Sequence, residues 1–212
     1  MHILVTGFEP FGNDQFNASG EAVRLVPDNA DGHRITKAIL PVSFQRSGEV
    51  LAALLQEHLP DALICVGEAG GRVEISLEVQ GANEDDARIP DNDGAQPIKQ
   101  SIVHPGETYR PASLDPEMIL RALHQAGHGA YLSEDAGRFV CNHIAYLAYG
   151  QTVPALFIHV PALRPTGQKP LVGAETDKSE AALRVQPRTG YTLPVLVEAL
   201  TVVLASLSEQ TE

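Results

Sequence analysis

The sequence ALICVG at residues 62–67 is an uninterrupted apolar run that passes into a glycine-rich stretch, GEAGGR at 67–72. An apolar run of this length next to a turn signal predicts a buried strand. The preceding segment, Phe44–Leu59, has apolar residues at helical spacing, and the following segment, Val73–Val79, strictly alternates apolar and polar residues. The sequence therefore predicts a helix before the strand at 62–67 and a second strand after it.

The same alternation of elements continues toward both ends of the chain. Further strands are predicted at His2–Thr6, Arg34–Pro41, Ala130–Ser133 and Pro154–Val160. Further helices are predicted at Ser19–Val26, Asp115–Ala126, Asn142–Tyr149 and Thr192–Leu207. Strands that alternate with helices predict an α/β sandwich, with helices on both faces of a largely parallel sheet, in one domain over residues 1–212.

The composition is that of a globular protein, with 43% hydrophobic and 20% charged residues. Its 15 basic and 27 acidic residues give a formal charge of −12. Such a surface would repel nucleic acid and anionic membranes. No stretch is long enough to span a bilayer, and the start, MHILVTGFEP, lacks the charged and apolar segments of a signal peptide. We therefore expect a cytoplasmic protein without a nucleic-acid or membrane partner.

The two cysteines, Cys65 and Cys141, differ in their surroundings. With no Cys-x-x-Cys pair, the sequence predicts no structural metal site, and nothing in it indicates a cofactor. Cys65 lies inside the apolar run at 62–67, which is typical of an inert core thiol. Cys141, in AGRFVCNH at 136–143, is expected in the first turn of a helix, where the helix N-terminus favours the thiolate. We interpret Cys141 as a nucleophile.

A thiol nucleophile usually needs a histidine base. His143 is near Cys141 in the sequence, but residues two apart on a helix point to different sides. His159 ends the apolar run ALFIHVP at 155–161, where a rigid strand would deliver its side chain to the edge of the sheet. We prefer His159, with His104 as the weaker rival. Four others are expected to be solvated bystanders: His33, His58, His124 and His128.

A carboxylate should orient the imidazole and favour its charged form. Glu74 and Glu78 both lie on the polar face of the predicted strand at 73–79. The alternation alone does not choose between them, and both could equally be solvated.

Two loops are candidates for ligand binding. GEAGGR at 67–72 could cradle a phosphate, but it lacks the ending of a P-loop, and Glu68 within it disfavours an anion. Backbone donors to a carbonyl oxygen fit this loop better. TGFEPFG at 6–12 carries Phe8 and Phe11, which could form an apolar wall, and Asn17 beyond it could add directional hydrogen bonds.

Together these segments resemble one family, the pyrrolidone-carboxylate peptidases, also called pyroglutamyl peptidase I. The likeness is carried by TGFEPFG at 6–12, NAS at 17–19, EAV at 21–23, ICVGEAGGR at 64–72, ISLE at 75–78, ARIPDN at 87–92, AGRFVCNH at 136–143 and FIHVP at 157–161. It implies a three-layer α/β/α fold with a mixed sheet and a catalytic set of Cys141, His159 and Glu78, which prefers Glu78 over Glu74. It also implies removal of an N-terminal pyroglutamyl residue from peptides by a cytoplasmic homotetramer.

The resemblance also implies how the lactam ring would be held. Phe8 and Phe11 would form a slot for the flat ring, while Asn17 and backbone groups of Glu68 and Val140 would read its amide. Arg88 resembles a further family position near the site.

One departure leaves alternatives open. Glu68 stands where the family commonly has glutamine, and a carboxylate near the thiol would disfavour the thiolate. A catalytically silent pyroglutamyl-binding protein and a phosphate- or nucleoside-binding α/β protein therefore remain as other hypotheses. The segments 100–111 and 165–190 match the family poorly, so the likeness says little about subunit contacts there.

Overall fold

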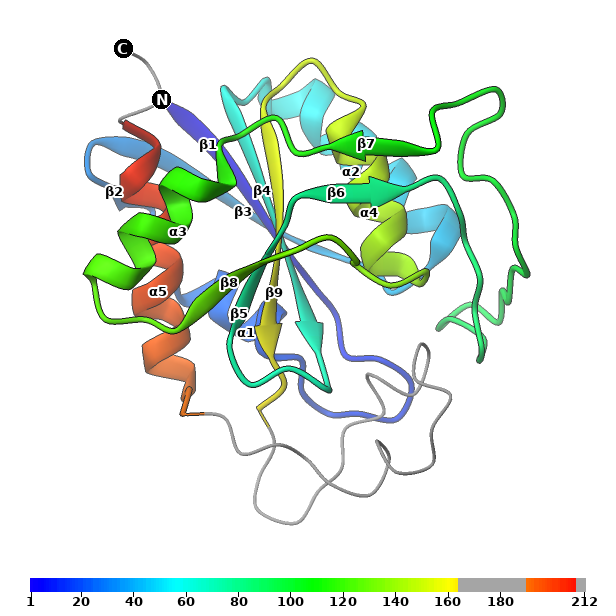
Figure 1. Cartoon of the computed structure of the whole chain (residues 1–212), viewed down its shortest axis with the longest axis horizontal. Helices are drawn as coiled ribbons and strands as arrows, with labels where there is room; N and C mark the ends of the chain where they lie inside the picture. The colour runs from blue at the N-terminus through cyan, green and yellow to red at the C-terminus, as the bar shows by residue number, and fades with distance from the viewer. Residues whose placement is uncertain (164–189, 209–212) are drawn as a thin grey trace.

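A seven-stranded sheet runs through the computed structural model, which describes residues 1–163 and 190–208 (Figure 1). Its strand order is β2-β3-β1-β4-β9-β5-β8. The strands are β1 (His2–Phe8), β2 (Asn29–Ala30), β3 (His33–Leu40), β4 (Ala62–Ala69), β5 (Ile75–Glu78), β8 (Ala130–Ser133) and β9 (Ala155–Pro161). Strands β3, β1, β4 and β9 are parallel, whereas β5 runs antiparallel to β9 and β2 antiparallel to β3. The expected largely parallel, mixed sheet is confirmed.

Helices cover both faces of this sheet (Figure 1). One face carries α1 (Ala18–Leu25), α3 (Pro116–Gln125) and α5 (Leu193–Ser206), and the other carries α2 (Phe44–His58) and α4 (Val140–Tyr149). Each face has its own core of buried apolar side chains, which accounts for the two-sided burial of the central strands. Among the described residues, none of the helices has both the length and the apolar character needed to cross a bilayer. The expected three-layer α/β/α architecture is confirmed.

Side-chain caps fix the starts of three helices but not the start of α4. Asn17, Ser43 and Asp115 accept hydrogen bonds from first-turn N–H groups of α1, α2 and α3. At α4 the N-cap residue is Phe139, whose side chain makes no capping hydrogen bond. The first-turn N–H groups of α4 have no acceptor within the helix. They remain available near Cys141, the second residue of α4.

Several strand boundaries differ from the sequence prediction. β1 continues to Phe8 and β4 to Ala69, so the first three residues of GEAGGR belong to the sheet rather than to a loop. The strand predicted at Val73–Val79 is shorter, because pairing with β8 and β9 extends only over Ile75–Glu78. Val73 was expected on the apolar face but is 39% exposed, outside the strand.

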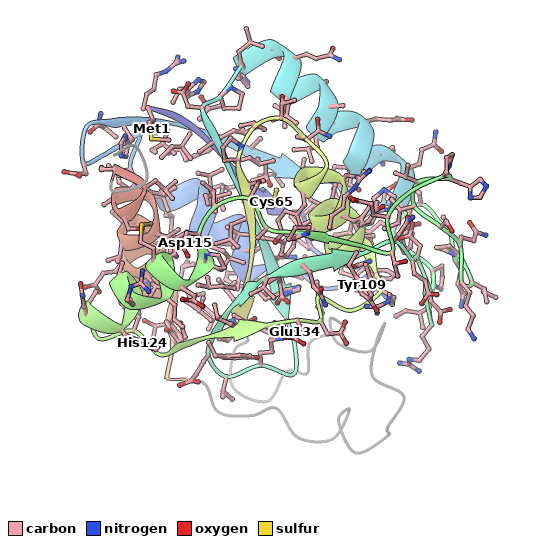
Figure 2. All side chains as sticks on the ribbon, turned by 45° about the horizontal axis from the view of Figure 1, so that its top comes forward. Met1, Cys65, Tyr109, Asp115, His124 and Glu134 are labelled. Carbon is pink, nitrogen blue, oxygen red and sulfur yellow. The ribbon has the colours of Figure 1, made fainter. Side chains whose placement is uncertain are left out.

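A second, two-stranded sheet of β6 (Gln80–Ala82) and β7 (Tyr109–Pro111) was not predicted (Figure 2). Its strands are too short to show a period in the sequence. Asn142 of α4 holds β6 in place, because its side-chain amide exchanges two hydrogen bonds with the backbone of Ala82, at 2.8 and 2.9 Å. Part of the divergent segment 100–111 thus lies next to α4. The divergent segment 165–190 lies, apart from Gly190, outside the described residues.

Close approach of α1 to β1 depends on glycine. A Cβ on Gly20 would lie 2.2 Å from the carbonyl oxygen of Phe8. No side chain fits at this distance, so Gly20 lets α1 lie directly against Phe8, the last residue of β1.

Two of the four histidines expected to be solvated are buried. His33 is 6% exposed, and its Nε2 lies 2.7 Å from Ser208 Oγ at the end of α5. His128 is 8% exposed and stacks on Tyr191. The prediction of solvent exposure is wrong for these two, because the segments that cover them are distant in the sequence.

Candidate active site

Cys141 is the second residue of α4 and lies in its first turn, as the sequence predicted. Its Sγ lies against Gly67 of β4, since a Cβ on Gly67 would come within 2.9 Å of the sulfur. The thiol is partly exposed, whereas Cys65 is fully buried among the strands (Figure 2). Burial raises the pKa of the Cys65 thiol to about 12. Of the two thiols, only Cys141 combines access with a helix N-terminus that stabilises the thiolate.

His159 comes to the same place from the neighbouring strand. In the register of β4 and β9 it is the partner of Gly67, the residue that contacts the thiol. Side chains alternate along a strand, so His159 shares a face with Phe157, and the two rings are 5.0 Å apart between centroids. That face is the one α4 covers. The strand therefore places the buried His159 side chain on the side of the sheet where Cys141 lies.

Glu78 completes this arrangement. Its Oε1 is 2.8 Å from His159 Nδ1. Glu74 instead lies before β5, where its carboxylate is next to Gly129. The structure thus brings Glu78 to the histidine and leaves Glu74 apart from it.

The polar face of β5 is not solvated. Ser76 and Glu78 are both fully buried, because β5 lies between β9 and β8 and its polar face is turned to the α4 side of the sheet. The alternation had correctly separated these residues from Ile75 and Leu77, which pack on the other face. What the pattern did not reveal was that protein covers both faces.

Arg72 also contacts the buried carboxylate, and sequence reasoning gave it no role in catalysis. Its guanidinium bonds Glu78 Oε1 and Ser76 Oγ. Burial raises the pKa of Glu78, but the hydrogen bond and charge of His159 and the charge of Arg72 outweigh it, so this pKa is lowered overall. Burial lowers the pKa of His159, and Arg72 lowers it further against the opposing effect of Glu78. At neutral pH, Glu78 is therefore ionised and His159 is neutral and able to accept a proton.

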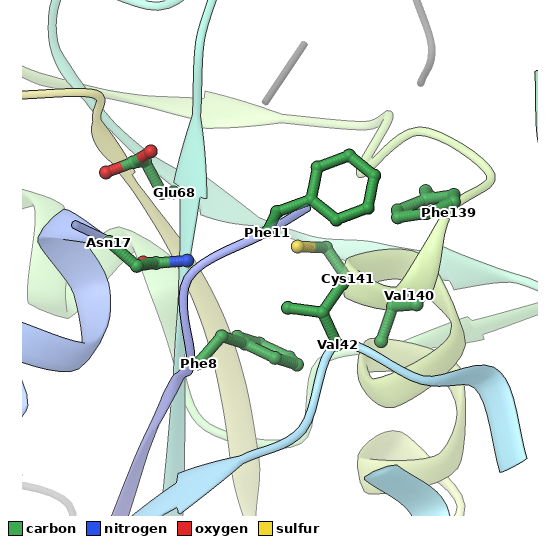
Figure 3. Close-up of a pocket in the computed structure, with 8 residues that line it drawn as sticks. All are labelled: Phe8, Phe11, Asn17, Val42, Glu68, Phe139, Val140 and Cys141. Carbon is green, nitrogen blue, oxygen red and sulfur yellow. The ribbon is translucent and has the colours of Figure 1, made fainter. Parts of the chain in front are cut away.

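An apolar pocket opens beside the thiol (Figure 3). It is lined by Phe8, Phe11, Asn17, Val42, Glu68, Phe139, Val140 and Cys141. The rings of Phe11 and Phe139 meet edge to face, 5.3 Å apart. The structure therefore brings five of the predicted binding residues together around Cys141. Val42 and Phe139 were missed, although Phe139 stands two residues before the cysteine.

Asn17 is engaged in holding the fold. Its Oδ1 accepts hydrogen bonds from the N–H and the hydroxyl of Ser19, at 3.0 and 2.7 Å, and its Nδ2 donates to the carbonyl of Glu9 at 3.0 Å. The side chain thereby joins the first loop to the start of α1. Asn17 therefore contributes to the pocket by lining it and by holding the first loop in position.

Glu68 lies on the opposite face of β4 from Gly67 and the thiol. Its Oε2 accepts the backbone N–H of Ala18 at 2.5 Å, at the N-terminus of α1. A helix N-terminus stabilises negative charge, so α1 supports this buried carboxylate. Figure 3 shows Glu68 on the far side of the pocket from Cys141.

Two other candidates do not line this pocket. Arg88 is exposed and is not among the residues that line the pocket. His104 is exposed in the segment 100–111. Within residues 1–163 and 190–208, no group of three or more His, Cys, Asp or Glu side chains is placed to hold a metal ion.

The fold and these juxtaposed groups define the class of protein as a cysteine hydrolase of α/β architecture. A sequence model of the family described as pyroglutamyl peptidase matches residues 1–178. The chain belongs to this pyroglutamyl peptidase family.

Relatives and solved structures agree with this assignment. A pyrrolidone-carboxylate peptidase of Streptococcus suis is 41% identical over 169 residues, which cover 77% of this chain and 79% of the relative. One from Streptococcus pyogenes serotype M12 is 41% identical over 167 residues, 76% and 78% of the two chains. The crystal structure of pyroglutamyl peptidase I from Bacillus amyloliquefaciens superposes with a TM-score of 0.84 at 31% identity, covering 98% and 97%. The structure of a variant pyrrolidone carboxyl peptidase from Pyrococcus furiosus superposes with a TM-score of 0.86 at 32% sequence identity, covering 100% of both chains.

Proposed function

We propose that this chain is a cysteine-type omega peptidase that hydrolyses the amide bond after an N-terminal pyroglutamyl residue and releases 5-oxoproline. Family membership and the names of the relatives support the reaction. The observation that carries the proposal is the 2.8 Å hydrogen bond between Glu78 and His159, formed beside Cys141 at the edge of an apolar pocket.

The pocket suits the chemistry of the substrate. Pyroglutamate is a neutral lactam without a free α-amine, so it needs an apolar slot and a few hydrogen bonds rather than an ionic clamp. Phe8, Phe11 and Phe139 offer aromatic surface for a flat ring. Backbone groups at Glu68 and Val140 border the same space and are available to read the lactam amide.

In the first step, the Cys141 sulfur attacks the carbonyl carbon of the scissile amide. His159 accepts the thiol proton and returns it to the leaving nitrogen as the carbon–nitrogen bond breaks. Glu78 fixes the imidazole through Nδ1 and stabilises its charged form. The developing oxyanion lies near the first turn of α4, where backbone N–H groups stabilise negative charge. The products are a free peptide amine and a pyroglutamyl thioester on Cys141.

In the second step, water hydrolyses the thioester. His159 takes a proton from the water as its oxygen attacks the carbonyl carbon. The carbon–sulfur bond then breaks, the sulfur recovers the proton from His159, and 5-oxoproline leaves. Each residue returns to its starting state.

The site argues against both alternative hypotheses. A phosphate in the GEAGGR loop would need Arg72, but Arg72 is bonded to Glu78 and Ser76. A silent binding protein was suggested by Glu68, but that carboxylate is held at the N-terminus of α1, on the other face of β4.

The proposal extends to the biological unit. It takes residues 1–212 as one peptidase domain that works in the cytoplasm as a homotetramer on pyroglutamyl peptides. The family resemblance supports the tetramer and the compartment, and the formal charge of −12 supports the absence of a nucleic-acid partner.

The decisive measurement is release of a fluorophore from a pyroglutamyl amide by wild type, Cys141→Ser and Cys65→Ala. We expect Cys141→Ser to lose roughly 10³-fold or more in kcat/KM, because a hydroxyl is a far weaker nucleophile beside this base. Cys65→Ala is the matched control and should stay close to wild type. Full activity of Cys141→Ser would refute the proposal. Wild-type binding of free pyroglutamate without any turnover would support the silent binding protein instead.

A further inference from the structure

The guanidinium of Arg72 touches both halves of the candidate active site. It bonds the carboxylate that holds His159, and it bonds the loop that leads to Cys141. We propose that Arg72 is a positioning residue that locks Glu78 in its ionised, histidine-facing orientation and ties this acid–base pair to the start of the nucleophile helix. The inference rests on the proposed function and deepens it.

The first contact concerns the orientation of the carboxylate. Arg72 Nη1 bonds Glu78 Oε1 and Ser76 Oγ, and Ser76 Oγ itself donates to Oε1 at 3.2 Å. His159 Nδ1 approaches the same oxygen. The other oxygen, Oε2, is buried and has no hydrogen-bond partner within the part of the chain that the structure describes. Arg72, Ser76 and His159 thus all contact the carboxylate through Oε1, and Arg72 is the only full positive charge among these three contacts.

The second contact concerns the approach to the nucleophile. Arg72 Nη2 donates to the backbone carbonyl of Asp135 at 2.7 Å. The Asp135 carboxylate in turn accepts the N–H of Gly137 at 3.0 Å and Arg138 Nη1 at 2.8 Å. This tight turn ends at Phe139, the N-cap of α4, two residues before Cys141. One planar guanidinium therefore bridges β5 and the segment that sets the position of the thiol.

A lysine could not replace this bridge. Its ammonium is a point charge on a flexible stem, whereas the guanidinium presents several N–H donors in a fixed plane. Lysine would retain the positive charge beside Glu78 but could not reach the Asp135 carbonyl in the same geometry. Arg72→Lys therefore separates the effect of charge from that of the bridge.

The positive charge of Arg72 should shift the pKa values of Glu78 and His159 in a predictable direction. Among the described residues, Arg72 and Asp135 are the charged groups that act on the Glu78–His159 pair from outside it, and the Tyr149 hydroxyl donates to the Glu78 carbonyl at 2.6 Å. Cys141 lies on the same face of the sheet. Arg72 lowers the pKa of Glu78 and also that of His159. Removing its charge raises the pKa of both groups, so the base stays protonated up to a higher pH.

The test compares Arg72→Met and Arg72→Lys with wild type in the pyroglutamyl amide assay across pH. For Arg72→Met we expect kcat to fall about 100-fold, because small misplacements of catalytic groups have effects of this size. The acid limb of its kcat/KM profile should move up by about one pH unit. KM should change less than kcat, because Arg72 does not line the pocket. Arg72→Lys should lose about tenfold in kcat without a shift of the acid limb.

A second readout does not depend on turnover. In the Cys141→Ser background, which lacks the nucleophilic thiol beside His159, the His159 imidazole is followed by NMR and assigned by difference with His159→Gln. Its titration midpoint should rise in Arg72→Met and stay in place in Arg72→Lys. An inactive wild type would overturn the proposed function while this titration still reports on Arg72. An unmoved midpoint in Arg72→Met, or wild-type kcat in Arg72→Lys, would overturn the role of Arg72.

Discussion

Two carboxylate–histidine pairs lie close to Cys141, and they differ in ways that matter for catalysis. Glu78 with His159 and Asp85 with His143 have the same contact, a carboxylate oxygen 2.8 Å from Nδ1. Protein covers most of both pairs: side-chain exposures are 0% for Glu78 and 5% for His159, and 9% for Asp85 and 13% for His143. Contact and burial alone therefore do not distinguish a catalytic pair from a structural one.

The location of the imidazole is the first difference. His159 stands on β9 opposite Gly67, which contacts the thiol. His143 is on α4 itself and turns toward α2, where its ring lies 5.9 Å from that of Phe44. A helical neighbour two residues away cannot face the same way as Cys141, so the second pair fastens α4 to its surroundings.

The charge environment is the second difference. Glu78 has Arg72 beside it, and its pKa is lowered overall. For Asp85, burial raises the pKa and outweighs the opposing hydrogen bond and charge of His143. Its Oδ1 has no hydrogen-bond partner within residues 1–163 and 190–208. Nearby positive charge favours the ionised form of a buried carboxylate, and Arg72 supplies that charge at Glu78.

The largest expected effect separates the two histidines. Glutamine keeps much of the volume of histidine but cannot accept the thiol proton. His159→Gln should lose roughly 10³-fold in kcat/KM toward the pyroglutamyl amide, while His143→Gln should stay within about threefold once folded. Thermal unfolding of both variants checks that they are native. Similar losses in the two variants would make the second pair part of the catalytic machinery.

Substitution of Glu78 and of Asp85 should also give different losses of kcat, and this difference should be smaller than the one between the two histidines. Glu78→Gln leaves the imidazole without its anionic partner, and we expect kcat to fall roughly 10²-fold. Asp85→Asn should change kcat by less than about threefold, since His143 takes no proton in the reaction. The same assay measures both. A larger loss for Asp85→Asn than for Glu78→Gln would reverse the comparison.

The contributions of Glu78 and Asp85 to the stability of the native state should change with pH in opposite directions. The pKa of Glu78 is lowered by folding, so its charge stabilises the native state above its ordinary pKa, and this contribution is lost as pH falls below about 4.3. The pKa of Asp85 is raised, so the native state takes up a proton there as pH falls from neutral toward about 4.

Thermal midpoints of wild type, Glu78→Gln and Asp85→Asn across this pH range test the two signs. The advantage of wild type over Glu78→Gln should shrink at the acid end. Relative to Asp85→Asn, wild type should gain stability as pH falls. Parallel curves for all three proteins would contradict both assignments.

The smallest effect is expected at a third buried carboxylate, Glu68. Its Oε2 accepts the Ala18 N–H at the start of α1. Glu68→Gln keeps an acceptor oxygen and loses the favourable charge at the helix N-terminus, which is worth about 1 kcal/mol. We expect a modest decrease in melting temperature and a change in kcat/KM below about tenfold. A loss as large as that of Glu78→Gln would show that the carboxylate takes part in the reaction.

Much of the fold followed from sequence periodicity, and the exceptions have physical causes. The helices and the long strands were predicted because each buries a regular apolar pattern. The short strands β6 and β7 were missed, since they are held by Asn142 across about sixty residues of sequence rather than by a local pattern. The reversed direction of β5 was also invisible, because strand direction depends on the connections and not on the residues of the strand.

The sequence by itself determined where the chemistry could be: a thiol in the first turn of a helix, a histidine at the end of an apolar strand and phenylalanines in the first loop. These are local features, set by neighbours within a few residues. The family resemblance preferred Glu78 over Glu74, and the tertiary structure brings Glu78 to His159. Only the tertiary structure decided that Arg72 serves this carboxylate and that the Glu68 carboxylate bonds the start of α1. The reason is that electrostatic environments arise from segments brought together by the sheet, and burial and charge pairing are not encoded in any one of them.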